Sequence, residues 1–330
     1  MNIIDGSTIL VTGGTGSFGN AFVKSVLAKY SIDRLIIYSR DEFKQHAMSQ
    51  KFYDFREKIR FFLGDVRDLK RLKRACEGVD YLVHAAALKQ VPALEYNPTE
   101  AVQTNIMGSE NVINAVADTG VKKAILISSD KAVNPTNLYG ATKLVAERLF
   151  ISANAYVGGK STFSVVRYGN VVGSRGSVAP IFRNLKNEGR KVFPLTDERM
   201  TRFWITLEQS VNLSLSALVE GIGGEIFVPK IPSMRIVDLA RAIDPEVSFD
   251  IIGIRPGEKL HETLISEDEA RHTRIFKDMY VILPQFSETV SDFAEAAFVE
   301  KYNISVPDEF VFTSDKNDEW LTGSDFQEIL

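Results

Sequence analysis

The sequence predicts an α/β protein with a Rossmann-type, doubly wound parallel sheet, followed by a smaller and more irregular C-terminal domain. Two observations carry this prediction. Through the first 170 residues, short continuous apolar runs alternate with longer amphipathic stretches, as expected for buried parallel strands joined by helices. A glycine-rich loop follows the first apolar run and opens the first helical stretch, which is where Rossmann-type folds place their phosphate-binding turn.

Six strands and several helices are expected in this first part. The strands are short and rich in branched side chains, and they lie at 7–13, 34–40, 59–65, 81–87, 123–129 and 162–170. Helical stretches lie between them, for example at 17–30 and 98–119. Repeated strand–helix–strand units imply right-handed crossovers within one parallel sheet.

The pattern changes after about residue 170, where short apolar pieces are separated by glycine and proline, the usual turn residues. We therefore expect a Rossmann domain at 1–170 and a second domain, mainly for substrate binding, at 171–330. The run at 225–229 is expected to return to the first sheet. The tail after about residue 284 is weakly patterned and receives no assignment.

Composition and charge narrow the possible partners and location. The formal net charge is −4, which argues against a general nucleic-acid binder, since such proteins carry a basic surplus. The only cysteine, Cys76, allows no intramolecular disulfide and fits a reducing compartment. The N-terminus lacks the features of a secretory signal, and no apolar run approaches the roughly 20 residues needed to span a bilayer. We expect a cytoplasmic protein without a membrane partner or a metal site.

The loop VTGGTGSFG at 11–19 predicts a dinucleotide-binding turn. Glycines here permit a tight turn and a close approach of the backbone to a pyrophosphate at a helix N-terminus. The alternative is a purely structural glycine-rich turn, but the position between strand and helix favours binding. We assign the loop side of the cofactor site to Gly13, Thr15, Gly16, Ser17, Phe18 and Gly19.

The end of the second strand favours NADP over NAD. An NAD site usually places an acid here, on the ribose 2′-hydroxyl, whereas this strand ends with Ser39 and Arg40. A guanidinium suits a 2′-phosphate, and Lys44 adds charge. Asp41 follows one position late, and Arg40 as a solvated surface charge is the competing interpretation.

Three further strand ends complete the expected cofactor site. Asp65 and Val66 follow the third strand, where the edge of an adenine is met. Small residues follow the fourth strand and let a dinucleotide lie against the backbone: Ala85, Ala86 and Ala87. His84, one residue earlier in an apolar run, is interpreted as a packing residue.

The segment SSDKAVNPTNLYGATK at 128–143 carries two kinds of acid–base group. Tyr139 and Lys143 are one helical turn apart, so a lysine cation is placed to stabilise a tyrosine phenolate. Asp130 and Lys131 form a second pair, which suggests a second chemical step, with a structural ion pair as the alternative. To act as a base, Lys131 would need its pKa lowered from about 10.4 toward 7–8.

These motifs together resemble the extended short-chain dehydrogenase/reductase superfamily, through the glycine loop, the HAAA run, Asn105 and the Tyr-x-x-x-Lys pair. Longer segments are similar to one branch, the configuration-inverting UDP-N-acetylglucosamine 4,6-dehydratases of the pseudaminic acid pathway. The resemblance runs from residue 7 to about 265, in the segments YSRDEFKQ, HAAALKQVP, SSDKAVNPTNLYGATK, RYGNVVGSRGSV, MTRFWITL, GGEIFVPKIPSM and IIGIRPGEKLHE.

The resemblance implies a lyase of nucleotide-sugar metabolism, with tightly bound NADP that is recycled in each turnover. C4 of UDP-N-acetylglucosamine is oxidised, water is eliminated across C5 and C6, and hydride returns to C6. The product is UDP-2-acetamido-2,6-dideoxy-beta-L-arabino-hex-4-ulose, the first intermediate toward pseudaminic acid for flagellin glycosylation and surface polysaccharide. Family members commonly assemble, so a homo-oligomer, dimer or hexamer, is expected.

The resemblance also implies roles for particular residues. Tyr139 and Lys143 serve hydride transfer, whereas Asp130 and Lys131 serve elimination and reprotonation. Retaining relatives have Asp-Glu where this sequence has Asp-Lys, so the lysine goes with inversion at C5. The implied substrate contacts are Lys89, Ser129, Asn170, Arg202, Arg255 and Glu258.

Other functions remain open at the level of sequence. A UDP-sugar 4-epimerase or 5-epimerase, or a dehydratase of a capsule pathway, would share the superfamily motifs. A regulator that binds NADP without catalysis is the non-enzymatic alternative, and the intact pairs at 130–131 and 139–143 argue against it.

Overall fold

The computed structural model describes residues 3–174, 177–285 and 292–329. Its centre is a ten-stranded sheet, and seven adjacent strands of this sheet are parallel. In spatial order these are β3 (Ile59–Leu63), β2 (Arg34–Ser39), β1 (Thr8–Thr12), β4 (Tyr81–His84), β5 (Lys123–Ile127), β6 (Thr162–Val166) and β10 (Ile226–Pro229). The order reverses between β1 and β4, as in Rossmann-type sheets. The predicted fold class is confirmed.

The C-terminal part of the chain enlarges this sheet. The segment expected at 225–229 forms β10 and pairs with β6 in parallel. Beyond β10 lie three antiparallel strands: β15 (Met279–Ile282), β14 (Thr273–Phe276) and β16 (Ile304–Ser305). Segments after residue 270 therefore belong to the same sheet as the N-terminal strands, whereas the sequence pattern places 171–330 mainly in the second domain.

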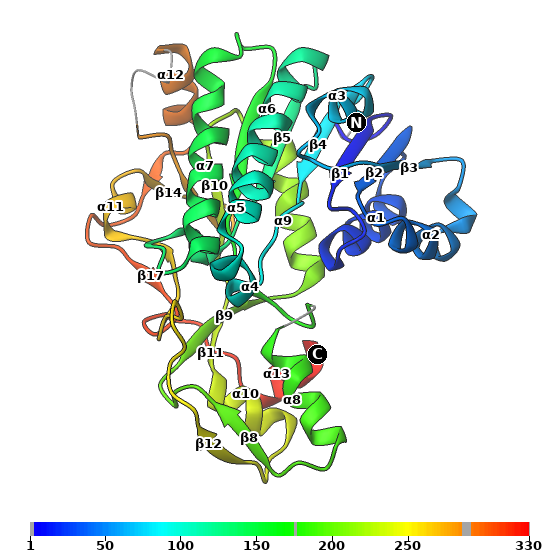
Figure 1. The fold of residues 1–330 in the computed structure, drawn as a ribbon. Coiled ribbons are helices and arrows are strands. Elements are labelled where there is room, and N and C mark those ends of the chain that lie inside the picture. Colours follow the sequence, from blue (N-terminus) through cyan, green and yellow to red (C-terminus); the bar gives the residue numbers. More distant parts are fainter. Residues whose placement is uncertain (1–2, 175–176, 286–291, 330) are drawn as a thin grey trace.

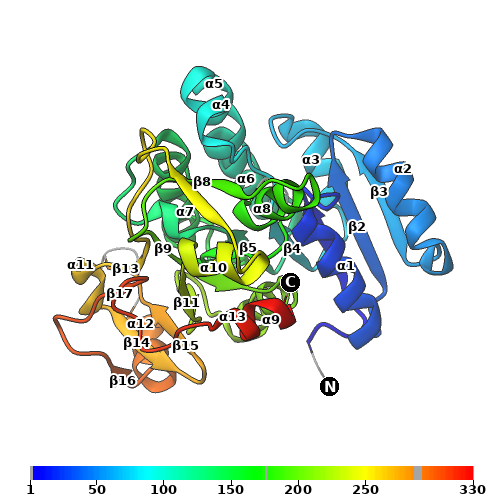
Figure 2. The same cartoon turned by 90° about the horizontal axis from the view of Figure 1, so that it is seen from below.

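Helices cover both faces of the sheet (Figures 1 and 2). Helices α1 (Ser17–Lys29) and α9 (Leu207–Glu220) pack together on one face. On the other face α6 (Gly108–Thr119) packs between α3 (Leu69–Cys76) and α7 (Leu138–Tyr156). The other helical segments of this domain are α2 (Glu42–Lys51), Tyr53–Phe55, α4 (Val91–Tyr96), α5 (Pro98–Ala101), the π-helical Val102–Met107 and the 3-10 turn Asp130–Ala132.

A second, smaller domain with its own hydrophobic core lies at the bottom of Figure 1. Its core includes Trp204 and Phe326, whose ring centroids are 5.2 Å apart, so the end of the chain packs into it. Its elements are β7 (Asn170–Val171), α8 (Val178–Asn187), β8 (Val192–Leu195), β9 (Thr201–Ile205), β11 (Ser233–Arg235), α10 (Ile236–Ile243), β12 (Ser248–Ile251) and α13 (Gly323–Ile329).

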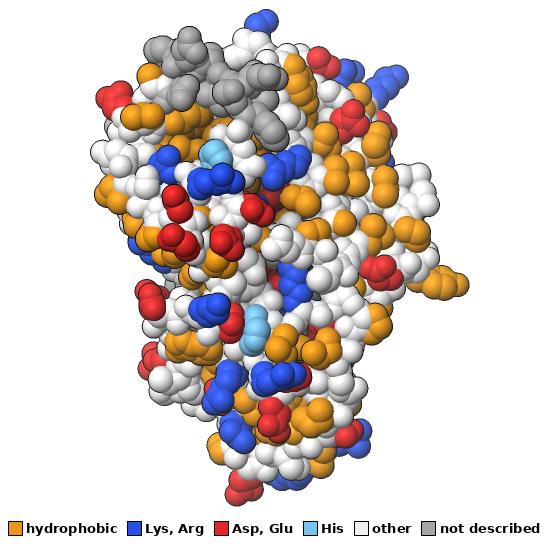
Figure 3. Space-filling model, turned by 90° about the vertical axis from the view of Figure 1, so that its left-hand side faces the viewer, with side chains coloured by type: hydrophobic (Ala, Val, Ile, Leu, Met, Phe, Trp, Pro, Cys, Tyr) orange, Lys and Arg blue, Asp and Glu red, His pale blue; other side chains and the backbone are white. Residues whose placement is uncertain are grey.

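A buried ionic cluster lies where the chain returns from the small domain to the large one. Arg167, which follows β6, contacts Glu147 of α7 at 2.7 Å and Glu269 at 3.0 Å. This anchors the returning segment, whose elements are β13 (Thr263–Ile265), α11 (Glu267–Ala270), α12 (Asp292–Lys301) and β17 (Phe312–Thr313). The face turned to the viewer in Figure 3 carries interspersed positive and negative side chains, in keeping with the small net charge.

Candidate active site

A cavity of about 570 Å³ opens at the carboxyl ends of the parallel strands, which is where ligands bind in open α/β sheets. Most residues assigned to the cofactor line it: Gly13, Thr15, Gly16, Ser17, Phe18, Ser39, Arg40, Lys44, Asp65, Val66, Ala85, Ala86, Ala87, Tyr139 and Lys143. Of the other assigned residues, Lys89, Ser129, Lys131 and Asn170 also line it.

The glycine loop has the backbone that a phosphate site needs. Gly13 has a φ of +65°, and a Cβ atom there would lie 2.8 Å from the backbone of Ala86, so only glycine fits. Helix α1 then begins at Ser17, and no side chain caps it at Gly16. Its first N–H groups are therefore available to an anion. Gly19 does not line the cavity; a Cβ there would lie 2.1 Å from the oxygen of Gly14, so its role is close packing.

The cations at the end of β2 are paired with carboxylates. Arg40 lies 3.4 Å from Asp65, and Lys44 lies 2.7 Å from Asp41. Asp41 also caps α2 by accepting a hydrogen bond from the Lys44 amide, and the pKa of Asp41 is lowered by these contacts with Lys44. Arg67 shares Asp65 with Arg40, at 2.8 Å. The Arg40 side chain is 48% exposed, so a ligand at the cavity can reach it.

Asn105 and His84 hold the walls of the cavity. Asn105 exchanges hydrogen bonds with both backbone groups of Leu88 and donates to Thr142, so it ties the loop after β4 to α7. It does not itself line the cavity. His84 is buried between Thr12 and Ser109, which lie 2.7 and 3.2 Å from its ring nitrogens. Burial lowers the pKa of His84 to about 3, which agrees with its interpretation as a packing residue.

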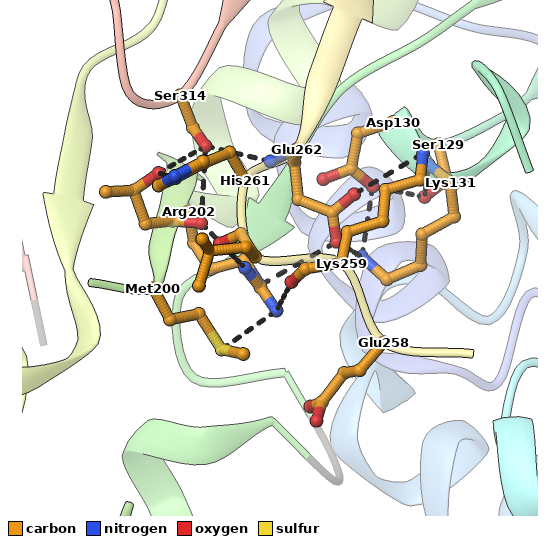
Figure 4. A network of polar contacts seen from close by, with 12 residues as sticks. Ser129, Asp130, Lys131, Met200, Arg202, Glu258, Lys259, His261, Glu262 and Ser314 are labelled. Carbon is orange, nitrogen blue, oxygen red and sulfur yellow. Dashed lines mark hydrogen bonds and ion pairs between the residues drawn. The ribbon is translucent and has the colours of Figure 1, made fainter. Parts of the chain in front are cut away.

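Asp130 and Lys131 lie in the turn that follows β5, and Lys131 contacts two carboxylates (Figure 4). Its Nζ lies 3.1 Å from Asp130 Oδ1 and 3.2 Å from Glu262 Oε1. Ser129 Oγ donates a 2.7 Å hydrogen bond to the same Asp130 oxygen. Asp130 is fully buried, whereas Lys131 is 27% exposed and faces the cavity. The pair thus lies at the cavity wall, with its ammonium toward the ligand space.

The hypothesis that the pKa of Lys131 is lowered toward 7–8 is wrong. Burial alone lowers this pKa, but the negative charges of Asp130 and Glu262 outweigh burial, and the pKa is raised. Lys131 is therefore an ammonium ion at neutral pH. The sequence reasoning considered Asp130 but not Glu262, which comes from a distant segment.

Tyr139 and Lys143 lie one turn apart on α7, and both line the cavity. Burial raises the pKa of the Tyr139 hydroxyl, and the Lys131 charge opposes this rise. Burial lowers the pKa of Lys143 to about 8, against the opposing effect of Glu147. Lys143 Nζ donates a 2.5 Å hydrogen bond to the carbonyl of Ile127. Lys131, which the sequence reasoning gave to a different step, thus also acts on Tyr139.

Several buried oxygen atoms on the cavity wall are available to a ligand. The side-chain oxygens Thr104 Oγ1, Ser128 Oγ and Asn170 Oδ1 have no hydrogen-bond partner in the part of the chain that the structure describes. Burying such groups without a partner costs free energy, so a bound polar ligand would relieve this cost. Nearby, burial and the Lys131 charge lower the pKa of Lys89.

The remaining predicted substrate residues lie outside the cavity lining. Arg202 is buried, and its guanidinium donates to the carbonyls of Thr201, Lys259 and Leu260. Arg255 is exposed, and its backbone N–H donates to Glu258, which points away from the ionic network in Figure 4. Within residues 3–174, 177–285 and 292–329, no cluster of metal-ligating side chains and no helix able to cross a membrane is present.

Comparisons with known proteins place this geometry in a family. A family model described as "Polysaccharide biosynthesis protein" matches residues 9–284. The inverting UDP-N-acetylglucosamine 4,6-dehydratase of Campylobacter jejuni subsp. jejuni serotype O:23/36 (strain 81-176) is 51% identical over 331 residues, which cover 99% of this chain and 98% of that protein.

The chain belongs to this polysaccharide biosynthesis family. The resemblance to the inverting dehydratases drawn from the motifs is confirmed. A crystal structure of Pen from Bacillus thuringiensis matches with a TM-score of 0.87 and 35% identity, covering 99% of this chain and 97% of that one. The dTDP-glucose 4,6-dehydratase DesIV from Streptomyces venezuelae, solved with NAD and TYD bound, matches with a TM-score of 0.70 over 77% of this chain and 86% of that one. At 22% identity, the second likeness shows the fold alone.

For this family member, sequence reasoning missed two groups beside the Asp130–Lys131 pair. Glu262 contacts Lys131, and Lys259 lies 4.0 Å from Glu262. Both belong to the quoted segment IIGIRPGEKLHE, from which only Arg255 and Glu258 were selected. The apolar residues around Glu262 could have hinted at a buried carboxylate, but the sequence pattern does not say which cation it meets.

Proposed function

We propose that the chain is an NADP-dependent UDP-N-acetylglucosamine 4,6-dehydratase that inverts C5. The observation that carries the proposal is the buried Asp130–Lys131 pair at the wall of a cavity that also contains Tyr139. Oxidation at C4 needs one acid–base group, whereas elimination of water across C5 and C6 needs a second. A 4-epimerase or a simple dehydrogenase needs no second pair, whereas a 5-epimerase would use one at C5 but would leave the C6 hydroxyl in place.

The residues present fit a nicotinamide dinucleotide. The Gly13 turn, the uncapped start of α1 and the backbone beside Ala86 would hold the pyrophosphate and the ribose. Arg40 and Lys44 would hold a 2′-phosphate and so favour NADP, by exchanging their present carboxylate partners for it. When bound, the cofactor accepts a hydride from C4 of the sugar and later returns it to C6.

Tyr139 is proposed as the group that takes the proton of the C4 hydroxyl. To do so it must ionise, and burial opposes this by raising its pKa. The Lys131 charge lowers the pKa, and Lys143 provides a second cation one turn along α7. With a pKa of about 8, Lys143 is largely charged at neutral pH. The two lysines thus supply the positive field that the phenolate needs.

The Asp130–Lys131 pair is proposed to handle the protons at C5 and C6. Because the pKa of Lys131 is raised, its side chain carries a proton at neutral pH and can hydrogen-bond the C6 hydroxyl as water leaves. Asp130 Oδ2 has no hydrogen-bond partner among the described residues, so it retains free acceptor capacity beside that ammonium. The ketone at C4 acidifies the C5 proton; the pair removes this proton, and a proton exchanged with solvent is later returned to C5. No net oxidation of the substrate results.

The proposal also includes the pathway, the location and the assembly of the protein. The product would enter the pseudaminic acid pathway, which serves flagellin and surface glycosylation. The protein would act in the cytoplasm, as a homo-oligomer, with UDP-N-acetylglucosamine as its substrate.

Product analysis tests the proposal directly. The purified protein is incubated with UDP-N-acetylglucosamine and NADP in deuterated water, and the product is followed by NMR, with Tyr139→Phe as the inactive control. A 4-keto-6-deoxy sugar with inverted, deuterated C5 and no accumulation of reduced cofactor is expected. A product that keeps its C6 hydroxyl would identify an epimerase instead. Cofactor binding without turnover would favour the regulator.

A further inference from the structure

Glu262 is a buried carboxylate that contacts the ammonium of Lys131 from a distant part of the chain. It lies just before β13, is 2% exposed, and places Oε1 3.2 Å from Lys131 Nζ. The Asp130 contact to the same nitrogen is almost equal, at 3.1 Å. Figure 4 shows both carboxylates directed at this one ammonium. A single lysine therefore meets two buried negative charges.

Hydrogen bonds to its backbone and a guanidinium near its carboxylate fix the position of Glu262. Its backbone N–H donates to Ser314 Oγ at 2.9 Å, and its carbonyl accepts from the Ser314 N–H at 2.8 Å. Arg202 Nε lies 3.7 Å from Oε1, and its guanidinium is itself held by the carbonyls of Lys259 and Leu260. The carboxylate is thus held in place before any ligand arrives.

We propose that Glu262 is a positioning residue that holds the Lys131 ammonium against Asp130 and strengthens the binding of its proton. This inference rests on the proposed function only for the reaction step that the ammonium serves. The charge arrangement itself belongs to the fold. Glu262 acts through Lys131 and does not line the cavity.

The alternative is that Glu262 only neutralises Arg202. Two observations disfavour this alternative. Glu262 Oε1 lies closer to Lys131 Nζ than to Arg202 Nε, and Arg202 already has three backbone carbonyls as acceptors. Lys259 is more distant, at 4.0 Å from Oε2. That oxygen has no hydrogen-bond partner among the described residues.

Charged and titratable groups from several elements act on Lys131 or are acted on by it. Asp130 and Glu262 raise the pKa of Lys131, and Arg202 lowers it. The Lys131 charge in turn lowers the pKa values of three neighbours: Lys89, Tyr139 and Lys259. Only the two carboxylates offset the burial of the ammonium. Removing one of them shifts the balance toward the neutral amine, by about 1–3 pKa units for an opposite charge at this range.

The test compares Glu262→Gln with Glu267→Gln, which removes an exposed carboxylate five residues further along. The glutamine at 262 keeps the shape and removes the charge. In the Glu262→Gln variant, kcat at neutral pH should fall more than KM changes, because the ammonium is no longer held against Asp130. Glu267→Gln should leave kcat unchanged. Glu262→Asp, which restores the charge, should recover part of the loss.

A second measurement does not depend on turnover. Acetylation of Lys131 by acetic anhydride is followed against pH by peptide mass spectrometry, with thermal unfolding as the check on folding. In the unmodified protein, Lys131 should react only well above the ordinary lysine range of about 10.4. In Glu262→Gln it should react at lower pH.

The outcomes separate the two proposals. If the unmodified protein fails to convert UDP-N-acetylglucosamine but the acetylation shift is present, the function is wrong and the inference stands. Ordinary reactivity of Lys131 in the unmodified protein overturns the inference, even if Glu262→Gln cannot be folded. A folded Glu262→Gln variant with an unchanged kcat and unchanged acetylation overturns it as well.

Discussion

Replacing Lys131 or Lys143 with alanine should block different steps of the proposed reaction. Lys131 lies 3.1 Å from Asp130 and 3.2 Å from Glu262, whereas Lys143 is bonded to the Ile127 carbonyl. Lys131→Ala should therefore abolish proton delivery at C5 and C6. Lys143→Ala should suppress the first oxidation and with it any transient cofactor reduction.

The size of the Lys131 effect follows from its contacts. Two unit charges about 3 Å apart interact by about 5 kcal/mol at an effective dielectric constant near 20. Losing the ammonium leaves two buried carboxylates facing each other, so one of them should take up a proton. A general acid contributes about 10²–10⁴-fold, and elimination should slow by that factor. Because Lys131 also lowers the pKa of Tyr139, oxidation should slow too, but by less.

A single-turnover experiment separates these effects. Absorbance of the reduced nicotinamide reports the oxidation, and deuterium at C5 reports elimination and reprotonation. Thermal unfolding shows whether each variant is folded, since removing one partner of a buried ion pair can cost about 3–5 kcal/mol. If Lys131→Ala still forms the 6-deoxy-4-keto sugar with inverted C5 at a near-normal rate, Lys131 is only a structural partner of Asp130.

Two other predictions concern the cofactor and stability. Arg40→Ala should remove most of the preference for NADP over NAD, which is about tenfold to hundredfold for a charge-assisted contact. Calorimetric titration measures the two affinities. Equal affinities in the unmodified protein would contradict the proposed site. His84 has a folded pKa of about 3, below the unfolded value near 6.5, so the unfolded state binds the extra proton between these values. The free energy of unfolding should thus fall by up to about 1.4 kcal/mol per pH unit below pH 6.5 from this group, and an equal slope in urea unfolding of His84→Gln would refute the assignment.

The cofactor side of the site could be predicted because it depends on local features. Parallel strands end at one edge of a sheet, so residues that follow successive strands meet there without further information. Gly13, Arg40, Asp65 and Ala86 each follow a different strand, and all four line one cavity. The backbone conformation at position 13 requires glycine, and the sequence shows this requirement only through the residue type.

The substrate side could not be predicted in the same way because it depends on contacts between remote segments. Arg202 was selected as a ligand contact from its motif, yet its N–H groups are directed at the carbonyls of the segment that carries Glu262. A base at Lys131 requires a lowered pKa, which burial or another cation would favour and Asp130 would oppose. Glu262, at 3.2 Å, adds a second opposing charge, and the two carboxylates together outweigh burial.

The C-terminal segment shows why its role was invisible in the sequence. Residues 312–313 form β17, which pairs with β13, and Ser314 then exchanges hydrogen bonds with both backbone groups of Glu262. Ser314 also lies 2.6 Å from Thr201, next to Arg202 on β9. Most of these bonds use backbone groups, which any sequence provides. The tail therefore carries no motif of its own, yet it contacts the backbone of Glu262 and of Thr201, the neighbour of Arg202. A short, weakly patterned segment can thus support the geometry of the candidate site through its backbone and one serine hydroxyl.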